Sequence, residues 1–396
     1  MNIKAIFTGV TLVATASMTS LSMAQPPGVT ADKIKIGILG SLTGPAAIWG
    51  SSNLAGGELA FEQINAAGGI HGRKLEWVVV DDETSPPKAI AGFKKLNEQD
   101  QVFAIFGPAA SAIGAALVPT MRAANVPVFM SVLSSPAVTD PVVKNVFRTG
   151  PLNDQKQGRA IANYVVGELK GKRIALLRQS DEYGSRGGSS VVKRMKELKV
   201  DPVAHEVFGP GDTDFTSQVL KIRETKPDVL IIYGYPSPSA IITRQARQLG
   251  VDAQIIGSNA TSSRRYPEIV GKVAAGTLNV ITNSELPESA EPKMAAFRKA
   301  FEARYPDLVK QVRPDLGDVL CYGGALTFIE ALKRAGKDLT REKFIAALEA
   351  LKDYNNGINL PTTFSATDHD GNNAARVMRI REDLTRELLP HILKAD

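Results

Sequence analysis

Short apolar stretches alternate with amphipathic stretches along most of the chain. The first apolar stretch, residues 34–39, is nearly continuous and carries isoleucine at every second position. This pattern is typical of a central strand in an open α/β sheet that helices cover on both faces. Gly40 ends the strand, and an apolar-sided stretch over 51–66 predicts a helix that the glycines at 68 and 69 terminate. Trp49 stands at the mouth of this helix, after a loop of small hydroxyl residues.

The alternation continues and then restarts after about residue 149. Further strands are predicted over 74–81, 102–106 and 126–130, with helices over 87–98 and 111–124. The second series predicts strands over 173–178, 203–208, 228–233, 253–257 and 276–282, with helices that end at 198, 225 and 249. Strands that alternate with helices in this way predict right-handed parallel sheets. We therefore expect two doubly wound units of similar size.

The tail is mostly helical. Amphipathic patterns predict helices over 292–305, 318–335 and 341–351. A hairpin-like segment follows, with strands at 362–364 and 376–381 around a turn at 368–372. This turn is similar to a calcium loop, but Gly371 is in the wrong place, which favours a tight turn. The tail should return to both units, and several crossings between them would form a hinge.

Length and charge narrow the class of protein. A chain of 396 residues suits two cores better than one. The formal net charge is +6 without any basic run, so a nucleic-acid partner is not indicated. Cys321 is the only cysteine, so the chain has no internal disulfide.

The N-terminus has the pattern of an export signal. Lys4 precedes an apolar run over 5–16, and Ser22-Met23-Ala24 fits the small-x-small rule. We expect residues 1–24 to be a signal peptide that is cleaved after Ala24. The apolar run is too short to span a bilayer and no second one appears, so membrane insertion is not expected. Export without disulfides fits the bacterial periplasm.

Candidate binding residues follow the predicted strands. In the first unit, hydroxyl side chains precede helices at Ser41 and Thr43, at Ser111, and at Ser134 and Ser135. Each alone is typical of a helix N-cap. Together, at one edge of a sheet, they and the unpaired N–H groups of helix N-termini would suit a carboxylate.

The second unit offers Tyr183, Tyr235 and Asn259 at the ends of its own strands. Each tyrosine alone is consistent with a half-buried surface aromatic residue. If they face the first unit across a cleft, they would line an apolar pocket together with Trp49.

Signatures of an enzyme are poor. The four histidines have no metal-binding spacing, and the chain has no nucleophile elbow, P-loop or dinucleotide fingerprint. We expect neither catalysis nor a cofactor or metal.

Several stretches together are similar to one known family. IKIGILGSLTGPAAIWG, ELAFEQINAAGGIHGRKLEWVVVDDETSPPKAI, VFAIFGPAASAIG, FTSQVLKIRETKPDVLIIYGY and RQARQLG resemble the periplasmic branched-chain amino acid-binding proteins, of the leucine/isoleucine/valine type. The resemblance covers nearly the whole chain after residue 24. It implies the type I periplasmic binding protein fold, α/β with two Rossmann-like lobes and a three-crossover hinge. The lobes would be 31–149 plus 283–361 and 150–282 plus 362–396.

The resemblance also assigns roles to single residues. Ser111, next to Ala110, and Ser134 would hold the ligand carboxylate through hydroxyl and backbone N–H groups, and the carbonyl of Val132 would face an α-ammonium. Trp49, Tyr183 and Tyr235 would contact the ligand side chain and close the cleft.

One position departs from the family pattern. Asn259 stands where the amino acid binders place an acidic residue that pairs with the α-ammonium. Because an unpaired buried ammonium is costly, this departure favours a carboxylate ligand that lacks the ammonium, such as an aromatic or other organic acid. The alternative is an amino acid held by other groups, such as Glu285.

These features predict a periplasmic receptor that delivers a small carboxylate to an inner-membrane ABC permease. A periplasmic ligand sensor that feeds a signalling system is the second interpretation. An exported enzyme on the same fold is the third, and the poor catalytic signatures count against it.

Overall fold

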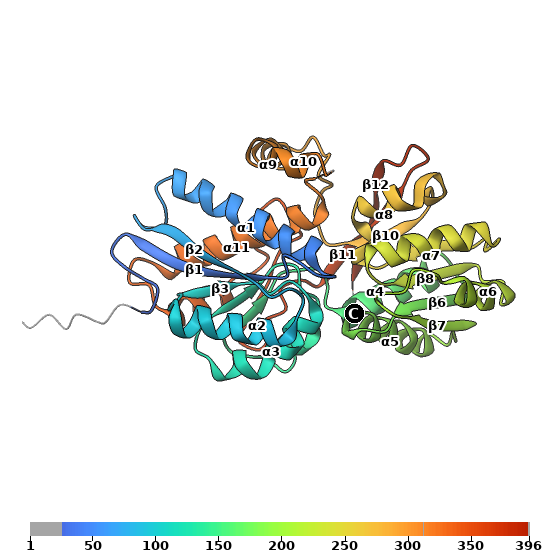
Figure 1. The fold of residues 1–396 in the computed structure, drawn as a ribbon, viewed down its shortest axis with the longest axis horizontal. Coiled ribbons are helices and arrows are strands. Elements are labelled where there is room, and N and C mark those ends of the chain that lie inside the picture. The colour runs from blue at the N-terminus through green and yellow to red at the C-terminus, as the bar shows by residue number, and fades with distance from the viewer. Residues whose placement is uncertain (1–25, 312, 395–396) are drawn as a thin grey trace, which may run out of the picture.

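The computed structural model describes residues 26–311 and 313–394. They form two α/β lobes side by side, each with a central sheet between helices (Figure 1). The predicted signal peptide and its cleavage after Ala24 lie outside the described residues. Within these residues, no helix combines the length and the apolar character that crossing a bilayer requires.

The first lobe is built on a five-stranded sheet in the order β2-β1-β3-β4-β5. All neighbouring pairs in this sheet are parallel. The strands are β1 (Lys33–Gly40), β2 (Lys74–Asp81), β3 (Ala104–Phe106), β4 (Val128–Met130) and β5 (Val146–Arg148). The helices that follow the strands are α1 (Ala47–Ala66), α2 (Pro86–Lys94) and α3 (Ser111–Ala123).

Two tail helices complete the core of this lobe, α11 (Leu316–Ala335) and α12 (Arg341–Glu349). Phe328 on α11 lies with its ring centroid 6.0 Å from Phe61 on α1, 5.9 Å from Phe106 on β3 and 5.6 Å from Phe129 on β4. Aromatic rings at such distances bury large apolar areas. A segment from the C-terminal third of the chain is therefore part of the first core.

The second lobe has a seven-stranded sheet in the order β12-β11-β10-β9-β8-β6-β7. Its strands are β6 (Ile174–Gln179), β7 (Ala204–Phe208), β8 (Val229–Tyr233), β9 (Gln254–Gly257), β10 (Leu278–Ile281), β11 (Ala374–Ile380) and β12 (Arg386–Lys394). Its helices are α4 (Asp154–Gly167), α5 (Glu182–Glu197), α6 (Thr216–Glu224), α7 (Pro236–Gln248) and α8 (Arg265–Val270). Two further helices, α9 (Pro292–Arg304) and α10 (Pro306–Val309), precede α11 at the top of Figure 1.

The predicted hairpin in the tail is wrong. β11 pairs antiparallel with β12 on one side and with β10 on the other. Residue 362 instead forms a bridge with Tyr354. Phe364 packs on Phe147 of the first lobe, with ring centroids 5.3 Å apart. We therefore propose that the last crossing between the lobes follows Phe364, and otherwise retain the lobe bounds given above.

Three more local differences concern the site. The first helix begins at Ala47 rather than at 51, which places Trp49 in its first turn. The helix after β6 begins at Glu182, so Tyr183 is helical rather than in a loop. The short strand β5, which the apolar pattern did not indicate, pairs with β4 and forms an edge of the first sheet.

A buried ion pair ties the first crossing to the last. Arg148, at the end of β5, is fully buried and pairs with Asp370, in the segment that leads to β11. Asp370 also accepts from Asn153 at 2.6 Å and lies 3.0 Å from the Lys156 ammonium. Among the described residues no acidic, histidine or cysteine cluster could hold a metal ion. The turn at 368–372 supplies Asp370, the acidic partner of Arg148. The Asp370 carboxylate is therefore part of the hinge.

A second ion cluster joins β12 to the start of α11. Arg386 is nearly fully buried and lies 2.7 Å from Asp315, the N-cap residue of α11, and 2.8 Å from Glu288. Burial acts to raise the pKa of Asp315, but the charge of Arg386 and several hydrogen bonds hold that pKa below its ordinary value. The cluster fixes the start of α11 against the second lobe.

Candidate functional site

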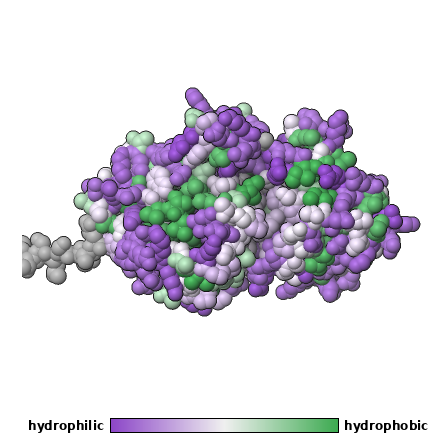
Figure 2. Space-filling view, viewed as in Figure 1, coloured by the Kyte–Doolittle hydropathy of each residue, from purple (hydrophilic) through white to green (hydrophobic). Residues whose placement is uncertain are grey.

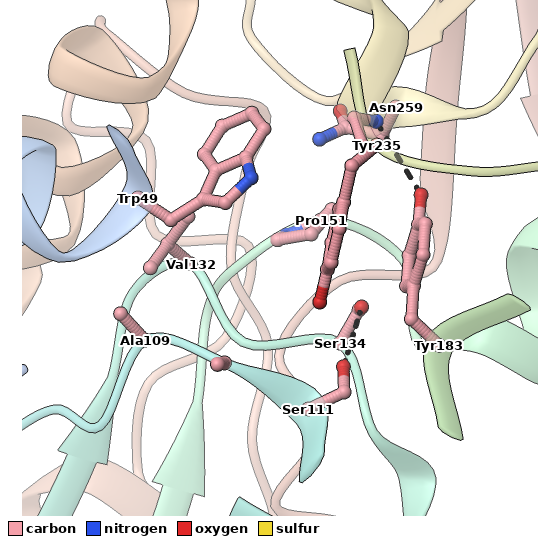
Figure 3. A pocket seen from close by; sticks show the side chains of 11 residues that line it. Trp49, Ala109, Ser111, Val132, Ser134, Pro151, Tyr183, Tyr235 and Asn259 are labelled. Atoms are coloured by element: carbon pink, nitrogen blue, oxygen red, sulfur yellow. Dashed lines mark hydrogen bonds between the residues drawn. The ribbon is translucent and has the colours of Figure 1, made fainter. Parts of the chain in front are cut away.

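A small pocket lies between the lobes, where strands of both sheets end. Its lining residues come from both lobes and from the first crossing (Figure 3): Trp49, Ala109, Ala110, Ser111, Val132, Ser134, Pro151, Tyr183, Tyr235, Asn259 and Ala260. The eight residues expected to contact the ligand are all among them, whereas Ser41, Thr43 and Ser135, the other hydroxyl residues considered from the sequence, are not. Ala109, Pro151 and Ala260 were not expected, and each adjoins an expected residue or the crossing.

The wall on the first lobe is made of hydroxyl groups at the start of α3. Ser111 is the first residue of that helix, and its Oγ lies 3.3 Å from the Oγ of Ser134 in the loop after β4. Ala110 precedes the helix in an extended conformation and offers no side-chain cap. The first N–H groups of a helix have no partner within it, so donors are available where these serines meet the pocket.

Trp49 faces the tyrosines across the pocket (Figure 3). It lies in the first turn of α1 and is 7% exposed. Its ring packs on Gly317 near the start of α11, where an added Cβ atom would lie 3.1 Å from the indole Cζ3 atom. The glycine therefore gives the indole room between α1 and α11.

The wall on the second lobe is a pair of stacked tyrosines. The rings of Tyr183 and Tyr235 have centroids 5.4 Å apart and planes only 7° apart. The backbone N–H of Ala260 donates to the Tyr183 hydroxyl at 3.4 Å. Burial raises the pKa of both phenols above their ordinary value, so they are neutral rings at physiological pH.

Asn259 begins a short 3₁₀ turn over Asn259–Ser262 after β9 and is 7% exposed. Its backbone N–H donates to the Gln157 Oε1 atom on α4 at 2.8 Å, which fixes its position relative to the crossing. Its side-chain amide is directed toward the pocket (Figure 3). Asn259 therefore presents a neutral amide to the pocket from the second lobe, whereas an acidic residue at this position would present a negative charge.

The lining carries no charge. Of the described residues that line the pocket, none is Asp, Glu, Lys or Arg. Glu285, the alternative partner for an ammonium, lies outside the lining and faces Arg376 at 3.9 Å. The positive potential for an anion would therefore come from the dipole of α3 and from oriented hydroxyl and amide groups.

One charged group that the sequence did not reveal lies next to this wall. Asp154, the first residue of α4, is fully buried, and its N–H donates to the carbonyl oxygen of Ser134 at 2.8 Å. Burial raises the pKa of its carboxyl group well above the usual range, although the Ser134 hydroxyl and the Arg148 guanidinium act in the opposite direction. An acid at a helix start is a common favourable pairing with the helix dipole, so nothing in the sequence marks this one as buried.

A wider cleft continues from the pocket toward solvent. It shares Trp49 and Tyr235 with the pocket, and its other lining residues include Arg264, Lys310 and Arg313. The outer surface is hydrophilic over most of both lobes in the view of Figure 2, with hydrophobic residues in separate patches. The two shared rings therefore stand at the passage between the pocket and the outside.

The two α/β lobes enclose a small uncharged pocket, and three chain crossings lie beside it. This arrangement is that of a two-lobed small-molecule-binding protein. A family model described as periplasmic binding protein matches residues 33–385. The chain belongs to this family.

Individual relatives agree with this assignment. The chain is 30% identical over 341 residues to a leucine-, isoleucine-, valine-, threonine- and alanine-binding protein of Pseudomonas aeruginosa, with 85% of this chain and 86% of the relative covered. It is 28% identical over 342 residues to the Leu/Ile/Val-binding protein BraC3 of Rhizobium johnstonii, with coverage of 86% and 88%.

Solved structures share the fold. The branched-chain amino acid transporter substrate-binding protein LivJ of Streptococcus pneumoniae, in complex with isoleucine, superposes with a TM-score of 0.78 at 28% identity, covering 90% of this chain and 99% of that one. A type 1 periplasmic binding protein from Bordetella pertussis gives 0.79 at 27% identity, with coverage of 91% and 100%. The predicted family and type I fold are confirmed.

Proposed function

We propose that the protein is the periplasmic receptor of an ABC importer and that it binds a small carboxylate with an apolar body in the pocket between the lobes. The observation that carries this proposal is the pairing of an uncharged hydroxyl-and-amide wall at the start of α3 with a wall of aromatic rings. The names of the relatives, which are amino acid-binding and transporter substrate-binding proteins, support the transport role.

Ser111 and Ser134, with the free N–H groups of α3, would hold the carboxylate. The carbonyl of Val132 and the amide of Asn259 would contact polar groups elsewhere on the ligand. Trp49, Tyr183 and Tyr235 would cover its apolar body. Because these contacts come from both lobes, a bound ligand would favour the closed arrangement over an open one, and this shift is what a permease would recognise.

The uncharged lining favours an organic acid, aromatic or otherwise, over an amino acid. An α-ammonium in this pocket would have no carboxylate among the lining residues, and an uncompensated buried cation is costly. The alternative ligand is a branched-chain or other hydrophobic amino acid, which the names of the relatives favour.

Titration calorimetry with benzoate, a branched aliphatic acid and leucine tests the ligand class. We expect binding of at least one of the acids and weak or absent binding of leucine. Tight binding of leucine alone would contradict the organic-acid ligand and leave the transport role intact. Failure of every carboxylate to bind would contradict the proposed site.

The proposed location can be tested separately. We propose that residues 1–24 direct export and are removed after Ala24. The intact mass of the protein from a periplasmic extract should correspond to a chain that starts at Gln25. A full-length chain that stays in the cytoplasmic fraction would contradict this.

A further inference from the structure

Asp154 is a buried acid with unsatisfied hydrogen-bonding capacity. Its exposed fraction is 0%, and within the described part of the chain neither carboxylate oxygen has a hydrogen-bond partner. The hydroxyl of Tyr233, whose ring lies 4.8 Å from that of Tyr183, is also buried and without a hydrogen bond of normal geometry, and it is a second neighbour of the Asp154 carboxyl group. Buried polar groups are normally paired, so an orphaned carboxyl beside a pocket calls for a specific explanation.

The surroundings of Asp154 oppose a negative charge there. Burial is the largest effect, and the carboxylates of Asp181 and Glu182 at the start of α5 add to it. The cation that faces it, Arg148, is already paired with Asp370. The remaining titratable neighbours are three neutral phenols, those of Tyr183, Tyr233 and Tyr235.

The protonation of Asp154 decides which way the serine hydroxyls can point. Asp154 and Ser134 are adjacent, since the Asp154 backbone N–H donates to the Ser134 carbonyl oxygen at 2.8 Å. The Ser134 hydroxyl favours the charged form of Asp154 although no hydrogen bond of normal geometry joins them here, and it lies 3.3 Å from the Ser111 Oγ. A hydroxyl group has one proton to donate, and an ionised carboxylate only accepts. Beside a charged Asp154, Ser134 would donate away from the pocket and present lone pairs to the ligand. Beside a neutral Asp154, it can accept that proton and turn its own toward the ligand.

We propose that Asp154 is a positioning residue for ligand charge: its carboxyl group is neutral when a carboxylate occupies the pocket, and it donates to Ser134 so that both serines donate to the ligand. This inference rests on the proposed carboxylate ligand. It narrows the ligand class to acids that present only acceptor atoms to the serines. No bond between heavy atoms changes; where Asp154 is charged in the free protein, one proton passes from solvent to its carboxylate on binding and forms the O–H group.

Two variants and a matched control test the proposal with benzoate as the probe. In Asp154→Asn the amide N–H replaces the donated proton, so we expect affinity within about threefold of the wild type at low pH and no change at high pH. The wild type should lose affinity by up to tenfold per pH unit above the pKa of free Asp154, as expected for uptake of one proton. Asp154→Leu lacks a donor and should bind about 5–10-fold more weakly at low pH, the effect of one neutral hydrogen bond. Glu342→Gln, which changes an exposed acid in the first turn of α12, should match the wild type throughout.

A difference infrared spectrum of the wild type provides a readout that does not depend on a variant folding. The benzoate complex should show the carbonyl stretch of a protonated carboxyl group that is absent from the Asp154→Asn complex. That band with a flat pH profile also supports the proposal, because Asp154 is then neutral before binding. Benzoate binding without the band overturns the proposal and leaves the proposed function standing. Absence of binding by any carboxylate at any pH overturns both.

Discussion

The paired serines allow the anion site to be tested quantitatively. Ser111 and Ser134 are 5% and 4% exposed, so water cannot easily replace either hydroxyl after substitution by alanine. A hydrogen bond to a charged group contributes about 1.5–3 kcal/mol. Each single alanine variant should therefore weaken carboxylate binding by about 10–150-fold, since 1.4 kcal/mol corresponds to a factor of ten.

The double variant shows whether the hydroxyls share one ligand group. Their Oγ atoms are 3.3 Å apart, a distance at which substitutions couple by about 0.5–3 kcal/mol. If the two hydroxyls act independently, the double variant should lose about 3–6 kcal/mol of binding free energy, the sum of the two single losses. If both contact one ligand oxygen, the loss should differ from that sum. Calorimetry on the wild type, both single variants and the double variant gives the four binding free energies of a double-mutant cycle. Ser237→Ala, on the exposed side of the outer cleft, is the control. A double variant that binds within threefold of the wild type would remove both serines from the site.

Three other predictions concern the frame around the pocket. Asp370→Asn leaves the fully buried Arg148 without its carboxylate and should lower the free energy of unfolding by about 3–5 kcal/mol in urea titrations; a loss under 1 kcal/mol would show that the pair is dispensable. Gly187→Ala places a Cβ atom 1.9 Å from the Tyr233 ring, so it should destabilise the protein by about 1–3 kcal/mol and weaken ligand binding through the stacked tyrosines; unchanged binding would separate that ring from the site. The pKa of Asp315 is depressed in the folded protein, so its contribution to stability is full above the unfolded value of about 3.8 and is lost as the pH falls through the folded value. Asp315→Asn should therefore flatten the loss of unfolding free energy between pH 5 and pH 2, and an unchanged slope would assign that loss to other carboxylates.

The lobes could be predicted because their strands are buried on both faces and read as continuous apolar runs. The segment that became β8 contains no charged residue and is followed by Gly234, and β1 carries isoleucine at every second position and ends at Gly40. The strands of the C-terminal segment were harder to predict. β12, with the sequence RELLPHILK, does not alternate polar and apolar residues and contains Pro390, so its sequence suggests no strand. Its pairing depends on β11, which depends in turn on β10, almost a hundred residues earlier.

The eight expected pocket residues could be found because the carboxyl ends of strands converge and because the family resemblance assigned their roles. Asp154 could not. Its buried surroundings include Tyr183 on α5 and Tyr233 at the end of β8, and the nearby Arg148 is paired with Asp370 across 222 positions. Local sequence patterns contain no information about such long-range pairings.

The position of Trp49 gives the protein an optical reporter of its own. The chain has two tryptophans, and the other, Trp77, lies on β2 and donates to Glu58 at 3.0 Å, away from the pocket lining. An indole at 7% exposure between two lobes changes its surroundings whenever the lobes move or a molecule enters. Replacing Trp77 by phenylalanine would leave a single emitter, whose fluorescence would follow occupancy and closing in real time without any attached dye.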